Sequence, residues 1–264
     1  MDERDRLANC FEEHRSHLRA VAYRMLGSVP EAEDALQEAW LRVARADASA
    51  VHNVREWLTT VVGRVCLNML RSRRSRPQGH AVHVPDPLVS LDERLDPEHE
   101  ALLADAVGLA LLVVLDTLAP AERVAFVLHD MFAVPFDDIG ALLDRTPVAA
   151  RKLASRARRR VRGSPEPDAD LARQRKVVDA FFAASRDGDF DALVAVLDPD
   201  VELRIDGGVL REDASLVLRG AHDVAAHTAT YARLFPFVRP ALVNGAAGAV
   251  VAPRGRPFSV MAFT

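Results

Sequence analysis

The sequence is poor in cysteine: only Cys10 and Cys66 occur among its 264 residues, far apart and in no metal-binding spacing. A disulfide framework or a structural zinc site is therefore not expected, and this cysteine usage suits a reducing cytosol. Gly-rich phosphate loops, nucleophile elbows and clusters of metal ligands are missing as well. These absences favour a protein that has no cofactor and is not an enzyme.

Long apolar runs are also missing. The most apolar stretch, Ala101 to Leu115, contains Asp105 and stops at Asp116, which is short of the roughly 20 apolar residues that span a membrane. The charged N-terminus does not resemble a signal peptide. We therefore expect a cytoplasmic protein with no membrane contact.

Lysine is nearly absent, occurring only at Lys152 and Lys176, so arginine carries almost all of the positive charge. The formal net charge of −4 hides an uneven distribution. Residues 51–80 hold six basic and one acidic side chain, residues 81–144 hold two and thirteen, and residues 145–162 hold eight and none. Two basic blocks separated by an acidic stretch are typical of a chain that contacts DNA at two places.

Proline and glycine clusters divide the chain into three folded parts. We expect an all-α domain over 1–76, a linker over 77–97, a second all-α domain over 98–163, a linker over 164–170 and an α+β domain over 171–264.

The periodicity of apolar residues refines this division. Residues 5–45 are expected to form two helices, the first ended by Gly27 and the second started near Ser28, with a third from about Val54 to Arg73. Helices resume near Pro97 and are broken at 118–120, 133–135 and 144–146. The last part is predicted to hold helices over 171–186 and 190–197, followed by strands near 201–205, 209–210, 215–218, 241–243 and 249–252.

The strongest local motif runs from Pro135 to Arg162. A short helix over 136–143, a tight turn and a second helix capped by Thr146 and started by Pro147 predict a helix-turn-helix. Arginine and lysine on the second helix suit guanine edges and phosphates. The candidates for base contacts are Arg151, Lys152, Ser155 and Arg156, and those for phosphate contacts are Arg158, Arg159, Arg160 and Arg162. The alternative is a helical hairpin with a basic surface, and a helix-turn-helix by itself does not separate a repressor from an initiation factor.

The segments 11–15, 22–27 and 31–42 together resemble region 2 of the sigma-70 family, and specifically its extracytoplasmic-function (ECF) group. Segments 56–62 and 71–74 continue the match, and 118–123 and 153–159 are similar to region 4 of the same group. The resemblance covers about residues 7–162 in the right order. It implies a factor that directs RNA polymerase core to −10 and −35 promoter elements.

The same resemblance implies roles for individual residues. The region 2 helix would dock on the β′ coiled coil of polymerase, with the β flap as a further contact, through Asp34, Gln37, Glu38, Leu41 and Arg42. The third helix would bind and open the −10 element through Asn53, Arg55, Trp57, Arg64, Asn68, Arg71, Arg73 and Arg74. Trp57 either stacks on a base or belongs to the helical core. The helix-turn-helix would read the −35 element.

The C-terminal part resembles the SnoaL-like branch of the NTF2-like cone domains found in SigJ-like factors, which implies control in cis. The matching linker residues are Val84, Pro85, Asp86 and Pro87, and the matching tail motif is Asp206, Gly207 and Gly208. The closing strand of that family is not found before Thr264, so the resemblance implies an incomplete cone. A small ligand in this domain is a further possibility.

Two other functional classes remain open at this stage. An NTF2-like enzyme would need an acid/base pair, and the candidates, Asp179, Asp206, Asp223, His222 and His227, show no spacing that selects one. A helix-turn-helix regulator with a ligand-sensing tail would explain 118–264 but leaves the acidic helix around Asp34 without a role.

Overall fold

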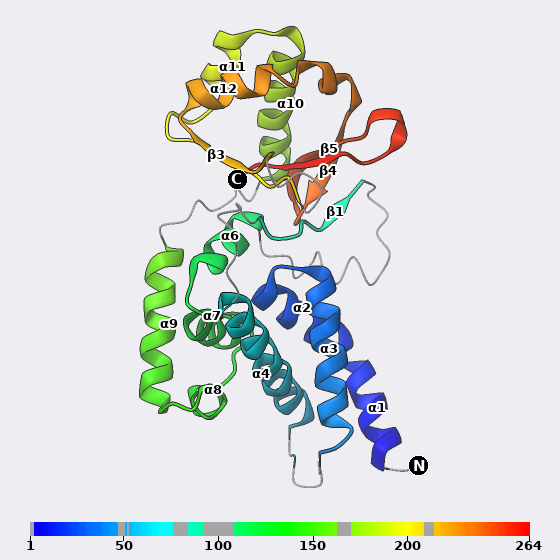
Figure 1. Ribbon diagram of the computed structural model, residues 1–264, viewed down its shortest axis with the longest axis vertical. Coiled ribbons are helices and arrows are strands. Elements are labelled where there is room, and N and C mark those ends of the chain that lie inside the picture. Colours follow the sequence, from blue (N-terminus) through cyan, green and yellow to red (C-terminus); the bar gives the residue numbers. More distant parts are fainter. Residues whose placement is uncertain are drawn as a thin grey trace. The chain divides into compact units, whose positions relative to one another are not determined.

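The structure is a computed structural model that describes residues 3–46, 51, 53–75, 84–91, 108–162, 170–208 and 214–264. The chain forms two compact units (Figure 1). The helical unit comprises Met1–Pro77 and Asp96–Pro165, and the C-terminal unit comprises Gln78–Leu95 and Glu166–Thr264. In the described residues, no helix is long and apolar enough to cross a membrane.

The helical unit begins with α1 (Glu3–Glu13), α2 (Arg15–Leu26), α3 (Val29–Val43) and α4 (Val54–Ser75). Gly27 ends α2 in the left-handed conformation, and the Ser28 hydroxyl caps α3 by accepting from the Glu31 amide, which confirms both predicted boundaries. The single helix expected before Gly27 is wrong, because the chain turns at His14 and forms α1 and α2. Hydrophobic spacing does not show this break, since Phe11 and Leu18 are buried on either side of it.

The second half of the helical unit contains α6 (Leu109–Thr117), α7 (Pro120–Phe126), the π-helical turn η1 (Val127–Met131), α8 (Phe136–Leu143) and α9 (Pro147–Val161). The predicted breaks before α7, before α8 and between α8 and α9 are confirmed. The predicted start of a helix near Pro97 lies outside the described residues.

A tight turn joins α8 to α9, as predicted for a helix-turn-helix. Asp144 adopts φ 54°, and the Thr146 hydroxyl accepts from the Ala149 amide at 3.2 Å. Gly140 is required by the same turn, because a Cβ there would lie 2.9 Å from the Arg145 carbonyl oxygen. The chain therefore passes close to α8 before α9 begins.

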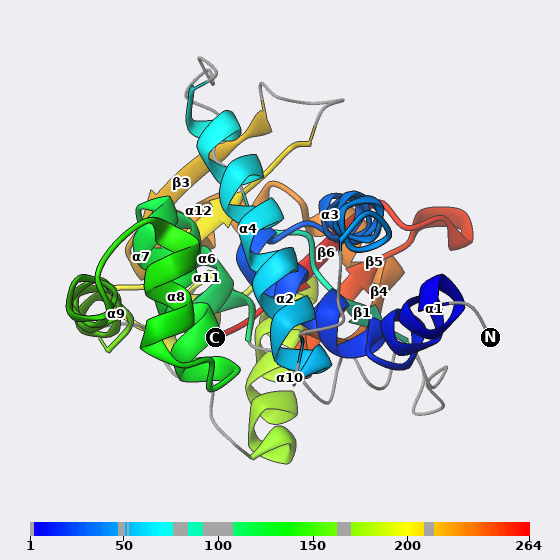
Figure 2. The same cartoon turned by 90° about the horizontal axis from the view of Figure 1, so that it is seen from below.

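Helix α4 is the helix of the first half that meets the second half: it packs on α2 and α3 as well as on α7 and α8 (Figure 2). Gly63 permits close packing, since a Cβ at this position would lie 3.1 Å from Leu128 and from Leu142. On the same helix Cys66 is fully buried, and this burial raises the pKa of its thiol to about 12.

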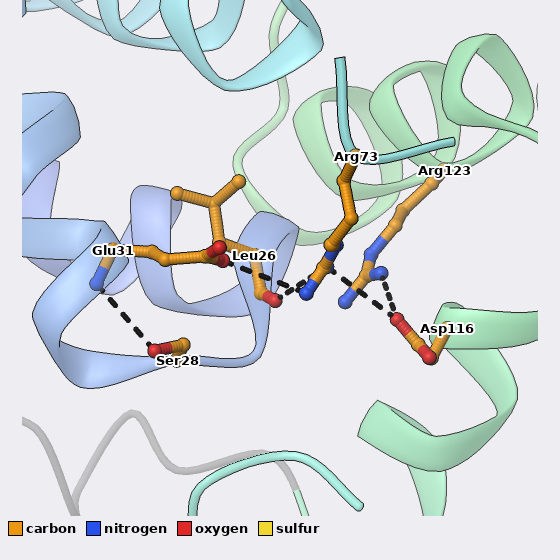
Figure 3. Close-up of polar contacts among 6 residues, drawn as sticks. All are labelled: Leu26, Ser28, Glu31, Arg73, Asp116 and Arg123. Carbon is orange, nitrogen blue, oxygen red and sulfur yellow. Dashed lines mark hydrogen bonds and ion pairs between the residues drawn. The ribbon is translucent and has the colours of Figure 1, made fainter. Parts of the chain in front are cut away.

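A buried arginine cluster joins the two halves (Figure 3). The Arg123 side chain is 2% exposed, and its Nη1 donates to Asp116 Oδ1 at 2.9 Å. Arg73 from α4 donates to the Leu26 carbonyl oxygen at 3.1 Å and lies 3.5 Å from Glu31 and 3.7 Å from Asp116. Burial lowers the pKa of Arg123, and the Asp116 carboxylate acts in the opposite direction. The Asp116 carboxylate therefore stabilises the charged form of Arg123 in a place that excludes water.

The C-terminal unit contains helices α10 (Leu171–Asp187), α11 (Phe190–Val196) and α12 (Ala221–Ala229), and 3-10 turns η3 (Ala232–Phe237) and η4 (Pro253–Gly255). Its antiparallel sheets are β2 (Glu202–Ile205) with β3 (Leu216–Arg219), and, in the order β1-β4-β5-β6, β1 (Val89–Ser90), β4 (Val238–Val243), β5 (Ala246–Val251) and β6 (Ser259–Ala262). This is the α+β class that the sequence predicted.

Most of the expected elements of this unit are present, with three differences. Helix α12 was not predicted, because its alanine-rich run shows no clear apolar stripe. Strand β6 was not predicted either, and the strand expected near 209–210 lies outside the described residues. The core gathers aromatic and small side chains from α10, α11, η3 and β5: Val178, Phe181, Phe182, Leu193, Phe235, Ala247 and Ala249.

Strand β1 comes from the segment that the sequence suggested as a linker. Val89 pairs with Val243, and Ser90 pairs with Leu242. This segment therefore completes the edge of the larger sheet of the C-terminal unit, although the whole second half of the helical unit separates it from β4 along the chain.

The Arg123–Asp116 pair gives a first prediction. In Asp116→Asn the buried guanidinium loses its counter-charge, and the free energy of unfolding should fall by about 3 kcal/mol. Replacing both residues with leucine should restore part of that loss, since no charge then remains buried. Chemical denaturation of the three proteins measures both effects. Equal stability of wild type and Asp116→Asn would show that the pair does not support the fold.

Candidate functional site

Helix α3 exposes a continuous polar face. All five residues predicted to meet polymerase are exposed there, while Ala32, Ala35, Leu36, Ala39 and Val43 are buried on the opposite side. The exposed set follows helical spacing and consists of Asp34, Gln37, Glu38, Leu41 and Arg42.

One apolar side chain stands out on this face. Leu41 is 47% exposed, and beside it Arg42 binds Glu38 at 3.0 Å. A hollow between α1 and α3 adjoins the face and is lined by Phe11, Trp40 and Asp34 among others. An apolar residue within a ring of polar groups is typical of a protein-binding surface.

Helix α4 carries the residues predicted to bind the −10 element. Trp57 is half-buried in the helical unit. Asn53 binds the Glu56 amide and carboxylate at the start of the helix, and Arg55 donates to His17 Nδ1 at 2.9 Å. The remaining exposed members of the set are Arg64, Asn68, Arg71 and Arg74.

Two arginines predicted to bind the −10 element, Arg64 and Arg73, bind groups in the second half of the helical unit. Arg64 donates to the Ala141 carbonyl oxygen of α8 at 3.1 Å, and Arg73 belongs to the cluster with Glu31 and Asp116. DNA would have to compete with these partners for both side chains.

Helix α9 presents the basic face predicted for the recognition helix. Ala150, Ala154 and Ala157 are buried, and the opposite face exposes Arg151, Lys152, Ser155, Arg156, Arg159, Arg160 and Arg162. Three side chains are held by neighbours: Thr146 caps the helix, Arg158 pairs with Asp130, and Arg160 lies 3.5 Å from Glu122.

Arg151 is oriented by an aromatic ring. Its guanidinium lies 5.2 Å from the centroid of Phe136, which itself stacks on His129 at 3.8 Å. This cation–π contact holds the Arg151 guanidinium near the N-terminal end of α9. Recognition helices contact base edges with this end.

In the C-terminal unit the tail motif binds the segment expected to be regulatory. Asp206 Oδ2 accepts from the Val84 amide at 2.9 Å, and Oδ1 accepts from the Gly208 amide at 2.8 Å. The Gly207 amide donates to the Ser215 hydroxyl at 3.0 Å. The carboxylate of Asp206 therefore connects two segments separated by 122 residues of sequence.

Asn244 is a residue of this contact that the sequence analysis missed. Its side-chain Oδ1 accepts from the Leu88 backbone amide at 2.9 Å, and the Asn244 backbone amide donates to the Leu88 carbonyl oxygen at 2.8 Å. Asn244 and Gly245 have φ values of 50° and 79°, and they form the two-residue turn between β4 and β5. An Asn-Gly pair between two β-rich runs is the signal that could have identified this turn.

The candidate acid/base residues of the tail are spread over several elements. Asp206 binds Val84, while His222 contacts the ring of Phe190 and His227 that of Tyr231. Within the described ranges, no three His, Cys, Asp or Glu side chains are placed to hold a metal ion.

Comparison with known proteins identifies both parts of the helical unit. Residues 10–76 match the family model for sigma-70 region 2, and residues 108–161 match that for sigma-70 region 4. The chain is 40% identical to the ECF RNA polymerase sigma factor SigJ of Mycobacterium tuberculosis over 251 residues, which is 92% of this chain and 80% of SigJ. It is also 40% identical to the probable ECF sigma factor SigI of the same species over 215 residues, which is 78% of this chain and 72% of SigI.

The structure agrees with these sequence matches. The crystal structure of M. tuberculosis SigJ superposes with a TM-score of 0.74 at 38% sequence identity, covering 96% of this chain and 89% of that one. The match extends over the C-terminal unit as well as the helical unit. The chain therefore belongs to the extracytoplasmic-function sigma factors of the sigma-70 family.

Proposed function

We propose that this protein brings RNA polymerase core to promoters through α3, opens the −10 element with α4 and reads the −35 element with α9. The observation that carries the proposal is the pairing of an exposed polar face on α3 with an exposed basic face on α9 in one sigma-type helical unit. A DNA-binding regulator has no need of the first of these surfaces.

The chemistry of α3 suits a protein partner. Asp34 and Glu38 would be repelled by phosphates, whereas an exposed Leu41 gains free energy when a partner covers it. The proposed partner is the β′ coiled coil of polymerase, with the β flap as a second contact for the region 4 half.

The chemistry of α9 suits duplex DNA. Arg151, Lys152, Ser155 and Arg156 are exposed in its first three turns, with Arg159 and Arg160 after them. We assign base contacts to the first group and phosphate contacts to the second. Arg158 has a different part in the free protein, because its pairing with Asp130 holds α9 against η1.

Promoter opening would involve a rearrangement of the helical unit. Arg64 and Arg73 bind groups of the region 4 half, so they become fully available to DNA when α4 separates from α6 and α8. We propose that docking on polymerase causes this separation and releases both arginines.

Control in cis would act through the segment over 84–91. Asp206 and Asn244 both bind its backbone, and β1 adds it to the sheet. This segment connects the two halves of the helical unit along the chain, so its capture by the C-terminal unit limits how far those halves can separate.

The first test is run-off transcription with bacterial core polymerase on a promoter pool. Wild type should give discrete transcripts, and Asp34→Lys/Glu38→Lys should give almost none. The two lysines would be repelled by a polymerase surface that is complementary to acidic residues. The matched control, Asp179→Lys/Asp187→Lys, reverses two exposed carboxylates on α10 and should initiate normally. Tight binding of duplex DNA without any initiation would instead identify a helix-turn-helix regulator.

A second test concerns α9. Arg151→Ala/Arg156→Ala should weaken recognition of the −35 element by about 1–3 kcal/mol for each base that the helix can then no longer bind. Promoter selection from a randomised −35 library measures this, with Arg175→Ala/Lys176→Ala on α10 as a control of equal charge. Unchanged promoter preference in the α9 variant would rule out the assigned base contacts.

A third test concerns the C-terminal unit. In Asn244→Gly the backbone can still adopt a positive φ, but the side-chain acceptor of the buried Leu88 amide is lost. This loss should lower the free energy of unfolding by about 1–3 kcal/mol. If the tail acts through this segment, transcription by Asn244→Gly should shift toward that of a chain ending near residue 163. Wild-type output from Asn244→Gly, with a different output from the shortened chain, would contradict this route of control.

A further inference from the structure

The sheet of the C-terminal unit has two different faces. Helix α10 packs on the face that carries Ala247, Ala249 and Met261 (Figure 1). Because neighbouring residues of a strand point to opposite faces, the register places Arg239, Val250 and Val260 together on the other face.

Two aromatic residues lie at the end of the sheet next to this row. The Ala252 amide donates to the Phe237 carbonyl oxygen, which continues the β4–β5 ladder by one pair, and the Phe258 amide donates to the carbonyl oxygen of Val251, the residue that pairs with Ser259. Phe237 therefore lies beside Ala252 and Phe258 beside Val251, at the end of the sheet that carries Arg239, Val250 and Val260.

Four exposed side chains lie over a buried floor at this end of the sheet. Phe237 is 43% exposed, Phe258 53% and Val260 36%, and Arg239 is also exposed, while Val250 and Ala252 are buried. We call Phe237, Arg239, Phe258 and Val260 the β4–β6 platform. Exposed apolar side chains that gather in one place are typical of a surface that a partner covers.

The segment that carries the platform has charged residues of one sign. From Val224 to Thr264 the chain contains four arginines and no aspartate or glutamate. Arg239 lies on the platform, and the others lie on or beside η3 and η4, which contact each other: Arg233, Arg254 and Arg256. All four are exposed, and none forms an ion pair with another residue of the described chain.

We propose that the β4–β6 platform binds single-stranded DNA. Aromatic rings on an open sheet face stack on unpaired bases, and arginines around them neutralise the phosphates. The initiation of transcription produces such a strand, so this surface would hold part of the opened promoter. The proposal goes beyond the assigned roles of α3, α4 and α9 and does not depend on them.

Two other occupants fit the platform less well. Base pairs of a duplex hide the faces of their bases within the stack, so Phe237 and Phe258 would gain little from them. A second copy of the chain would bring two sets of four arginines together without any acidic residue from this segment, and like charges at an interface are unfavourable.

The test measures binding of the full-length protein to a fluorescent 12-nucleotide single strand and to the matching duplex, without polymerase. Phe237→Ala/Phe258→Ala should weaken single-strand affinity about tenfold or more and leave duplex affinity unchanged. Arg239→Gln/Arg256→Gln should lower the slope of log affinity against log salt by about 0.7 for each phosphate that is no longer neutralised.

Two controls keep the result specific. Arg175→Gln/Val177→Ala removes one exposed charge and one exposed apolar side chain from α10, and it should bind the single strand like wild type. Phe237→Tyr/Phe258→Tyr preserves the rings and should retain binding, while thermal unfolding monitored by circular dichroism confirms that each variant is folded.

Photo-crosslinking to a 5-iodouracil strand, followed by peptide mapping, should place crosslinks at Phe237 or Phe258. The proposal is overturned if crosslinks fall only in α4 and α9 and the alanine variant binds like the control. It is also overturned if the alanine variant keeps its single-strand affinity but loses either polymerase binding or self-association seen by light scattering. Loss of single-strand binding with normal −35 selection separates this surface from the assigned role of α9.

Discussion

The buried pairing of Arg123 with Asp116 is the interaction on which the arrangement of the helical unit depends. A guanidinium that is only 2% exposed is costly unless a carboxylate faces it, and here that carboxylate also lies near Arg73 of α4. The first half of the helical unit, which carries α3, is therefore joined to the half that carries α9. Arg73, which we propose for contact with the −10 element, takes part in the same cluster.

The segment over 84–91 imposes a second constraint. In a plain linker the backbone amides would face water, but here those of Val84 and Leu88 donate to Asp206 and Asn244. Strand β1 then pairs with β4. This short segment is also part of the covalent connection between the two halves of the helical unit, and it is the connection through which we propose control in cis.

Local signals in the sequence were enough for the sigma regions. Gly27, Ser28, Thr146 and Pro147 mark helix ends through backbone preferences that act within a few residues, and the structure confirms each of them. The exposed faces of α3 and α9 followed from helical spacing alone. Prediction failed where the signal was absent or ambiguous: the turn at His14 interrupts an unbroken apolar pattern, and α12 lacks an apolar stripe. The Asn244–Gly245 turn carried a usable signal that was overlooked.

By itself, the sequence determined the family, the order of the two sigma regions and the residue types exposed on α3 and α9, because these depend on local patterns and motifs. Only the tertiary structure decided which of those side chains already bind other residues of the chain. Arg64, Arg73 and Arg158 look like free cations in the sequence, yet each meets an oxygen that lies 28 to 77 residues away in the chain. The tertiary structure likewise decided that β1 belongs to the C-terminal sheet and that Phe237, Arg239 and Phe258 lie at one end of that sheet. Such contacts arise from the packing of distant segments and from strand register, and neither leaves a periodic trace in the sequence.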